Sequence, residues 1–140
     1  MTVYLKMEKR FALRLKLHKV KGSVVHHCAL FQRVLAAQGT SARVVKGVCV
    51  VPQTREICEH FWVQSDKEGL DFDIGYEVGC LNSPELASVE TVLLPEAPDG
   101  FTKPDTDPEN IRLFELYQTD PKTFWAEAPV EVRNFNVNSK

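Results

Sequence analysis

Three strand-like segments follow one another closely in the middle of the chain, and this run most constrains the fold. They are Ser41–Val51, Cys58–Gln64 and Leu70–Val78. The first is rich in β-branched residues and the third alternates apolar and polar side chains, both of which are typical of strands. The turn-like "SDKEG" joins the last two, with Gly69 where a left-handed backbone is needed. Strands with such short connections predict an antiparallel meander.

An amphipathic helix is predicted directly before these strands, over Val24–Gln38. Its apolar residues that recur at helical spacing are Val24, Cys28, Phe31 and Leu35. Ser23 is suited to cap the start of this helix, and Gly39 is suited to end it. The helix and the strands together predict one α+β domain, with a central helix packed on an antiparallel sheet of three or more strands.

Length and composition fit a single globular domain. The chain has 140 residues, of which 44% are hydrophobic and 26% are charged, and no stretch approaches the roughly 18 apolar residues of a membrane helix. The four cysteines lack a CxxC pair and no secretory signal is recognised, which favours reduced thiols. Cys49 and Cys80 are expected to be core residues or bystanders. We expect a cytoplasmic protein, in the cytosol or inside a virion, without a membrane partner.

Residues 1–21 are strongly basic. They contain seven Lys or Arg and one Glu, a charge of +6, which leaves −8 for the remainder of a chain whose net charge is −2. Such an arm predicts either an anionic partner, such as nucleic acid, or contact with the chain's own acidic surface. The second is favoured because aromatic residues do not interleave the basic ones. Residues 10–18 place apolar side chains at every second position and predict a half-buried strand, although Leu and Ala also suit a helix.

The last part of the chain, residues 81–140, is predicted to be a helical extension of the core at residues 22–80. Short helices are expected where a capping residue precedes proline, at Ser83-Pro84, Asp107-Pro108 and Asp120-Pro121. A fourth strand is expected in "VETVLLP" (89–95). The final "VEVRNFNV" (130–137) is expected to be a last strand or a tail that lies on the body.

One histidine and two aspartates lie on the two strands of the predicted second hairpin. His60 and Trp62 share a strand face because side chains alternate along a strand. With a turn at residues 66–68, His60 comes opposite Asp73 or a residue next to it, and directly opposed side chains have Cβ atoms about 4.5–5.5 Å apart. A bond between them would fix the tautomer of His60, as a general base requires. Asp71 is the fallback partner, and Trp62 is expected to be a wall that substrate contacts; the alternative is that His60 is a buried structural residue.

Cys28 is a candidate nucleophile because it lies near the start of the predicted helix. Free N–H groups and positive potential at a helix N-terminus lower the pKa of a thiol. A cysteine on a helix, followed by a histidine and an aspartate on a sheet, is a recurrent arrangement of catalytic thiol sites. Cys28, His60 and Asp73 occur in that order.

The stretch from Gly22 to Gly75 resembles the core of the transglutaminase-like superfamily, which has a papain-type Cys-His-Asp site. The residues that match are Gly39, Ala42, Arg43, Val45, Gly47, His60, Trp62, Gly69 and Asp73. The resemblance implies that Cys28 attacks an amide or ester, that His60 is the base, and that Asp73 orients it. It implies a hydrolase or acyltransferase of peptidase, amidase or transglutaminase type. Its substrate would be a protein, a peptide or another amide or ester, and it would need no cofactor.

The register of the helix leaves two alternatives for the nucleophile. When the spacing to Gly39 is kept without gaps, the family's nucleophile position falls on Val24, in "GSV". Either the helix is one turn shorter and begins at Cys28, or it is full length and Cys28 is buried in its second turn. In the second case, the chain would be a catalytically inactive transglutaminase-like fold used as a binding or structural protein.

A third hypothesis is a zinc-stabilised interaction module. Nitrogen and sulfur ligands for a tetrahedral zinc ion would come from His26, His27, Cys28, Cys58 and His60. Their spacing matches no zinc motif, and the ion would compete with the triad for the same thiol and imidazole.

Overall fold

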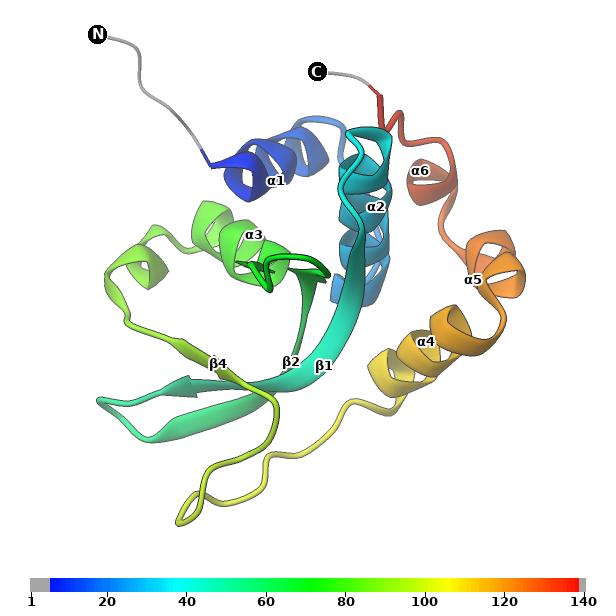
Figure 1. Cartoon of the computed structure of the whole chain (residues 1–140). Helices are drawn as coiled ribbons and strands as arrows, with labels where there is room; N and C mark the ends of the chain where they lie inside the picture. The colour runs from blue at the N-terminus through cyan, green and yellow to red at the C-terminus, as the bar shows by residue number, and fades with distance from the viewer. Residues whose placement is uncertain (1–5, 139–140) are drawn as a thin grey trace, which may run out of the picture.

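The computed structural model describes residues 6–138, which form six α-helices and one four-stranded sheet (Figure 1). The helices are α1 (Met7–Leu17), α2 (Val24–Ala37), α3 (Ile74–Asn82), α4 (Pro108–Thr119), α5 (Pro121–Glu127) and α6 (Val130–Arg133). The strands are β1 (Ala42–Val51), β2 (Glu56–Ser65), β3 (Asp71–Phe72) and β4 (Val92–Leu94), and η1 (Pro84–Ser88) is a 3-10 helix. The order is β3-β2-β1-β4 with every pairing antiparallel, so the predicted α+β class is confirmed. Within residues 6–138, no helix combines the length and the apolar character that crossing a membrane requires.

The β1–β2 hairpin is the centre of the sheet, because its ten-residue strands pair along their whole length. Helices α3 and α4 lie on opposite sides of this hairpin (Figure 1). On one side, the ring of His60 borders Gly75 of α3. On the other side, the ring of the next residue, Phe61, contacts Phe114 of α4 with centroids 5.6 Å apart. Alternation along β2 therefore gives the two helices separate faces of the strand.

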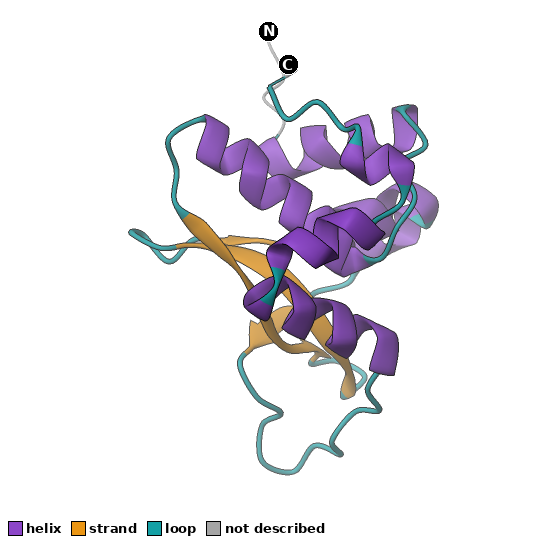
Figure 2. Cartoon of the chain, turned by 90° about the vertical axis from the view of Figure 1, so that its right-hand side faces the viewer, coloured by secondary structure: helices purple, strands orange, loops and turns teal. Residues whose placement is uncertain are grey.

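Helix α2 has both of the ends that the sequence predicts. The Oγ atom of Ser23 accepts a hydrogen bond from the backbone N–H of His26, and Nδ1 of His26 accepts one from the backbone N–H of Ser23. Gly39 follows the helix with φ at 83°, a conformation that glycine adopts without strain. The side chains that α2 buries in the core include Val25, Cys28, Leu30, Phe31 and Leu35. Figure 2 shows most of the helices crowded together above the sheet.

The predicted strand at residues 10–18 is wrong, because this segment belongs to helix α1. Phe11 and Leu15, four residues apart, are buried on one helical face. Leu13 and Leu17 are 40% and 76% exposed, although they continue the same alternation in the sequence. The segment consists mainly of Leu, Ala, Lys and Arg, which are good helix formers, and packing on the core selects the helix.

The predicted third strand, Leu70–Val78, is also mostly wrong. Only Asp71–Phe72 pairs with β2, and helix α3 begins at Ile74. The side chain of Asp73 accepts a hydrogen bond of 3.0 Å from the backbone N–H of Tyr76 and so caps the helix. This cap ends the strand after two residues, because the chain must turn to enter α3.

The C-terminal part confirms the helix starts at the two Asp-Pro pairs. Asp107 and Asp120 each accept hydrogen bonds from backbone N–H groups in the first turns of α4 and α5. Ser83 precedes η1, but its side chain makes no capping bond. Strand β4 falls within the predicted segment, whereas a helix, α6, replaces the expected last strand. The tail after α6 lies on the body, with the ring of Phe135 5.5 Å from that of Phe11.

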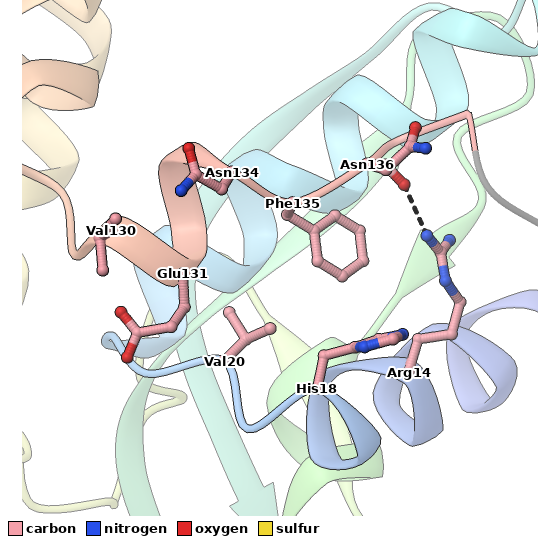
Figure 3. Close-up of a pocket in the computed structure, with 8 residues that line it drawn as sticks. All are labelled: Arg14, His18, Val20, Val130, Glu131, Asn134, Phe135 and Asn136. Atoms are coloured by element: carbon pink, nitrogen blue, oxygen red, sulfur yellow. Dashed lines mark hydrogen bonds between the residues drawn. The ribbon is translucent and has the colours of Figure 1, made fainter.

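The described part of the basic arm packs on its own chain. The guanidinium of Arg14 donates a 2.6 Å hydrogen bond to the carbonyl oxygen of Asn136 and lies over the ring of Phe135 (Figure 3). Lys16 donates a bond of 3.4 Å to the carbonyl oxygen of Leu81. The partners of these two residues are carbonyls and an aromatic ring, whereas Lys6 and Lys9 lie close enough to Glu77 of α3 for their charges to act on its carboxylate. An anionic partner for the arm stays a prediction.

Candidate functional site

His60 and Asp73 are brought together as the sequence predicts. Nε2 of His60 lies 2.6 Å from Oδ1 of Asp73, and their side chains are 17% and 16% exposed. The route differs from the prediction, because Asp73 reaches the histidine from the N-cap of α3 and not from an opposing strand. Nε2 makes this bond, so Nδ1 is the ring nitrogen of His60 that does not bind Asp73.

The fallback carboxylate, Asp71, binds other partners. Its Oδ1 atom accepts hydrogen bonds of 3.0 Å from the indole N–H of Trp62 and from the side-chain amide of Gln64. The register pairs Gln64 with Asp71, which places this carboxylate opposite a residue that lies four positions from His60 along β2. Trp62 in turn stacks against His60, with ring centroids 6.2 Å apart. Asp71 therefore fixes the aromatic wall of the site, and Asp73 fixes the imidazole.

The environment of His60 favours its protonated form. Burial alone would lower the pKa of the imidazole, but the hydrogen bond that His60 donates to Asp73, the negative charge of Asp73 and the charge of Cys58 together raise that pKa above its ordinary value. An imidazolium held beside a carboxylate can stabilise a neighbouring thiolate. The pair thus has the electrostatics of a thiol site, provided that a cysteine faces it.

Cys28 does not present its sulfur at the start of the helix. Helix α2 begins at Val24, so the full-length alternative holds and Cys28 lies in the second turn. The residue is 0% exposed, and its Sγ lies 3.7 Å from the carbonyl oxygen of Phe61, to which the thiol donates. Burial, with the charge of Asp73, raises the pKa of the Cys28 thiol far above its usual range. In this conformation the thiol is protonated and shielded from solvent.

Val24 occupies the first turn of α2, beside the histidine. A Cβ atom at Gly75 would lie 3.1 Å from Cγ2 of Val24 and 3.1 Å from Cε1 of His60. Both side chains therefore border the same point at the start of α3. Val24 is the position to which the resemblance assigns the nucleophile. Its side chain lies next to the imidazole of His60.

Two cysteines that the sequence did not link are paired on the hairpin that carries His60. Cys49 of β1 and Cys58 of β2 are directly opposed in the antiparallel register. Cys58 is exposed and shares its strand face with His60, two residues further along β2. Hairpin register is the signal that finds them, because pairing Gly47 with His60 also pairs the two cysteines.

The residues of the zinc hypothesis do not converge. His26 is engaged in the cap of α2 and contacts the ring of Phe124, whereas Cys28 lies in the core. Among the residues that the structure describes, no group of three or more His, Cys, Asp or Glu side chains is placed to hold a metal ion.

Two cavities lie away from the His60–Asp73 pair. One, of about 430 Å³, lies between the end of α1 and the C-terminal tail and is lined by Arg14, His18 and Glu131 among others (Figure 3). The other, of about 680 Å³, lies between the sheet and the loop before α4, with Glu59 in its lining. Since Glu59 precedes His60 on β2, the second cavity lies against the opposite face of that strand.

Comparisons of the chain with models of known protein families, with curated proteins and with solved structures find no match. The geometry of the site therefore carries the functional proposal.

Proposed function

We propose that this protein is a catalytically inactive member of the transglutaminase-like fold, used as a binding or structural protein. One observation carries the proposal. The side chain of Val24 stands beside His60 at the start of α2, while Cys28, in the second turn of the same helix, is enclosed in the core. A valine cannot form an acyl-enzyme intermediate, so the His–Asp pair has no nucleophile on that helix.

The pair has a structural role in this proposal. Asp73 joins His60 of β2 to the backbone of Tyr76 in α3, and Gly75 allows the helix to approach the imidazole closely. Helix α3 is thereby fastened to the sheet at its first turn. In this proposal His60 and Asp73 serve packing and not acyl transfer.

Acyl transfer through Cys28 is the second candidate, because the His60–Asp73 bond has the form that a thiol hydrolase needs. It requires α2 to open so that the sulfur of Cys28 leaves the carbonyl of Phe61 and reaches Nδ1 of His60. Only the conformation with an exposed thiol would be active.

The substitution Val24→Cys tests the proposal by returning a thiol to the helix start. We expect the variant to gain a thiol that p-nitrophenyl acetate acylates in a rapid burst, and the double variant with His60→Gln to lose that burst. Val24→Ser is the matched control, since a hydroxyl at this position is not activated in the same way. Peptide mass mapping identifies the acylated residue and separates it from Cys58.

The wild-type protein decides between the two candidates. The proposal predicts no acyl adduct at Cys28 and no His60-dependent turnover of ester or amide probes. Acylation mapped to Cys28 in the folded wild-type protein, and lost in His60→Gln, would overturn it in favour of the hydrolase.

A further inference from the structure

The cross-strand pair of Cys49 and Cys58 has the geometry of a disulfide in its reduced state. Directly opposed residues of antiparallel strands have Cα atoms about 4.5 or 5.5 Å apart, and both values lie in the range that a disulfide spans. Directly opposed residues also share one face of a hairpin, so the two thiols lie on the same side of the sheet. Forming the bond therefore needs side-chain rotation with little movement of the hairpin.

The two cysteines differ in access. Cys58 is exposed, and β3 pairs with β2 only at Val63 and Gln64, so within residues 6–138 no strand pairs with the outer edge of β2 at Cys58. Cys49 is half-buried in β1, between Cys58 on one side and Leu93 of β4 on the other. A reagent from solvent therefore reaches Cys58 before it can reach Cys49.

The surrounding charges also distinguish the two thiols. The hydrogen bond from Cys49 and the positive charge of His60, opposed by burial and by the charge of Asp73, lower the pKa of the Cys58 thiol to about 6. The pKa of Cys49 is raised, first of all by its bond to Cys58 and then by burial. These effects favour the thiolate at Cys58 and the proton at Cys49.

We propose that Cys49 and Cys58 form a thiol–disulfide exchange site, whose substrate is a disulfide, with Cys58 attacking and Cys49 resolving. The thiolate of Cys58 attacks one sulfur of R–S–S–R, forms a mixed disulfide and releases R–S⁻. Cys49 then gives up its proton and attacks the sulfur of Cys58. This step forms the Cys49–Cys58 disulfide and releases a second R–S⁻, which accepts the proton. The chain is oxidised by two electrons and the substrate is reduced to two thiols.

This chemistry does not depend on the loss of acyl transfer, because it uses neither Val24 nor Cys28. It gives the His60–Asp73 pair a second role, in which the imidazolium stabilises the attacking thiolate. His60 is a positioning residue here, since it acts through the charge on Cys58 and touches no substrate.

The first experiment treats the reduced, folded protein with oxidised glutathione at pH 7. We expect a product lighter by two hydrogen atoms, with a peptide that links Cys49 to Cys58. Cys49→Ser should stop at one glutathione on Cys58, and Cys58→Ser should give neither product. Cys80→Ser, the matched control, should behave as wild type. A disulfide-linked protein as oxidant, compared with glutathione, shows which source of disulfide reacts faster.

Two results would overturn the proposal. Glutathione spread over Cys58 and Cys80 without an internal link would show two ordinary surface thiols. Covalent dimers joined through Cys58 would show that Cys49 does not resolve the mixed disulfide. Circular dichroism of each variant verifies that the hairpin is folded in every comparison.

The second experiment measures the rate of iodoacetamide labelling against pH, residue by residue. At pH 6 we expect Cys58 to react about tenfold faster than Cys80, since its larger thiolate fraction outweighs its lower intrinsic nucleophilicity. The midpoint of the Cys58 profile should rise in His60→Gln and in Cys49→Ala. An unchanged midpoint in both variants would show that neither His60 nor Cys49 lowers the pKa of Cys58.

Discussion

The carboxylate of Asp73 holds the imidazole of His60 from the first turn of α3, with Oδ1 2.6 Å from Nε2. The same oxygen accepts the backbone N–H of Tyr76 at 3.0 Å. One atom therefore serves both as a helix cap and as the partner of a histidine on the sheet. Because the bond to His60 joins β2 to the cap of α3, and because His60 titrates, the stability of this junction should depend on pH.

Asp73→Asn separates the two functions of this carboxylate. Asparagine still caps a helix but carries no charge, so the pKa of His60 should fall. The raised pKa of His60 stabilises the wild type below the unfolded value of about 6.5, and this contribution is lost as pH rises through the folded pKa. We expect the variant to lose about 1–3 kcal/mol of unfolding free energy at pH 6 and less at pH 9. Urea denaturation at pH 6 and at pH 9 measures the free energy of unfolding of the variant and the wild type.

Asp73→Ala is the companion variant, since it removes the cap as well. Its additional loss relative to Asp73→Asn should be about 1 kcal/mol at both pH values. If the loss in Asp73→Asn were the same at pH 6 and pH 9, the charge interaction with His60 would not contribute to stability.

Asp71 should matter for Trp62 and not for His60. Asp71→Ala leaves the buried indole N–H without its acceptor, at a cost of about 1–3 kcal/mol, whereas Asp71→Asn keeps an acceptor oxygen and should cost less. The indole N–H resonance of Trp62 should shift in the alanine variant. A nuclear magnetic resonance titration should find the pKa of His60 nearly unchanged, and a large change would mean that Asp71 is the partner of His60.

The thiol of Cys28 should react only when the protein unfolds. Its sulfur is enclosed and bonded to the carbonyl oxygen of Phe61, so labelling by iodoacetamide should follow the rate of opening. Cys28→Ala should lower the free energy of unfolding by about 1 kcal/mol, because a buried side chain becomes smaller. Labelling of Cys28 as fast as that of Cys80 under native conditions would show an open site instead.

Gly47 should tolerate no side chain. A Cβ atom there would lie 2.4 Å from the carbonyl oxygen of Leu94 and 2.5 Å from the ring of Trp62. We therefore expect Gly47→Ala to destabilise the protein by about 1–3 kcal/mol in a thermal or urea denaturation.

Gly79→Ala is the matched control for this steric argument. Its Cβ would meet only the flexible end of Leu86, at 3.2 Å, and alanine favours the interior of helix α3. The control should be neutral or should gain about 0.5–1 kcal/mol. A similar loss in both variants would show that the close approach at Gly47 is not the cause.

Some of the site was predictable because its signals are local. Ser23 caps α2, Asp107 and Asp120 cap the next helices, and the hairpin strands carry β-branched residues that fix their type within a few positions. The pairing of His60 with Asp73 was predicted from alternation, although Asp73 reaches its place as a helix cap. The same alternation was wrong at residues 10–18, where the core buries a helical face.

The sequence by itself determined the class of the fold, the central helix, the long hairpin and the residues that could meet on it. Tertiary structure alone decided that Cys28 is enclosed while Val24 borders His60, and that Asp71 binds Trp62. It also decided that Cys58 has a charged neighbour and an open edge. Caps, turns and propensities act within one or two turns of chain, whereas the burial of a thiol and the partner of a carboxylate depend on segments far apart in the sequence.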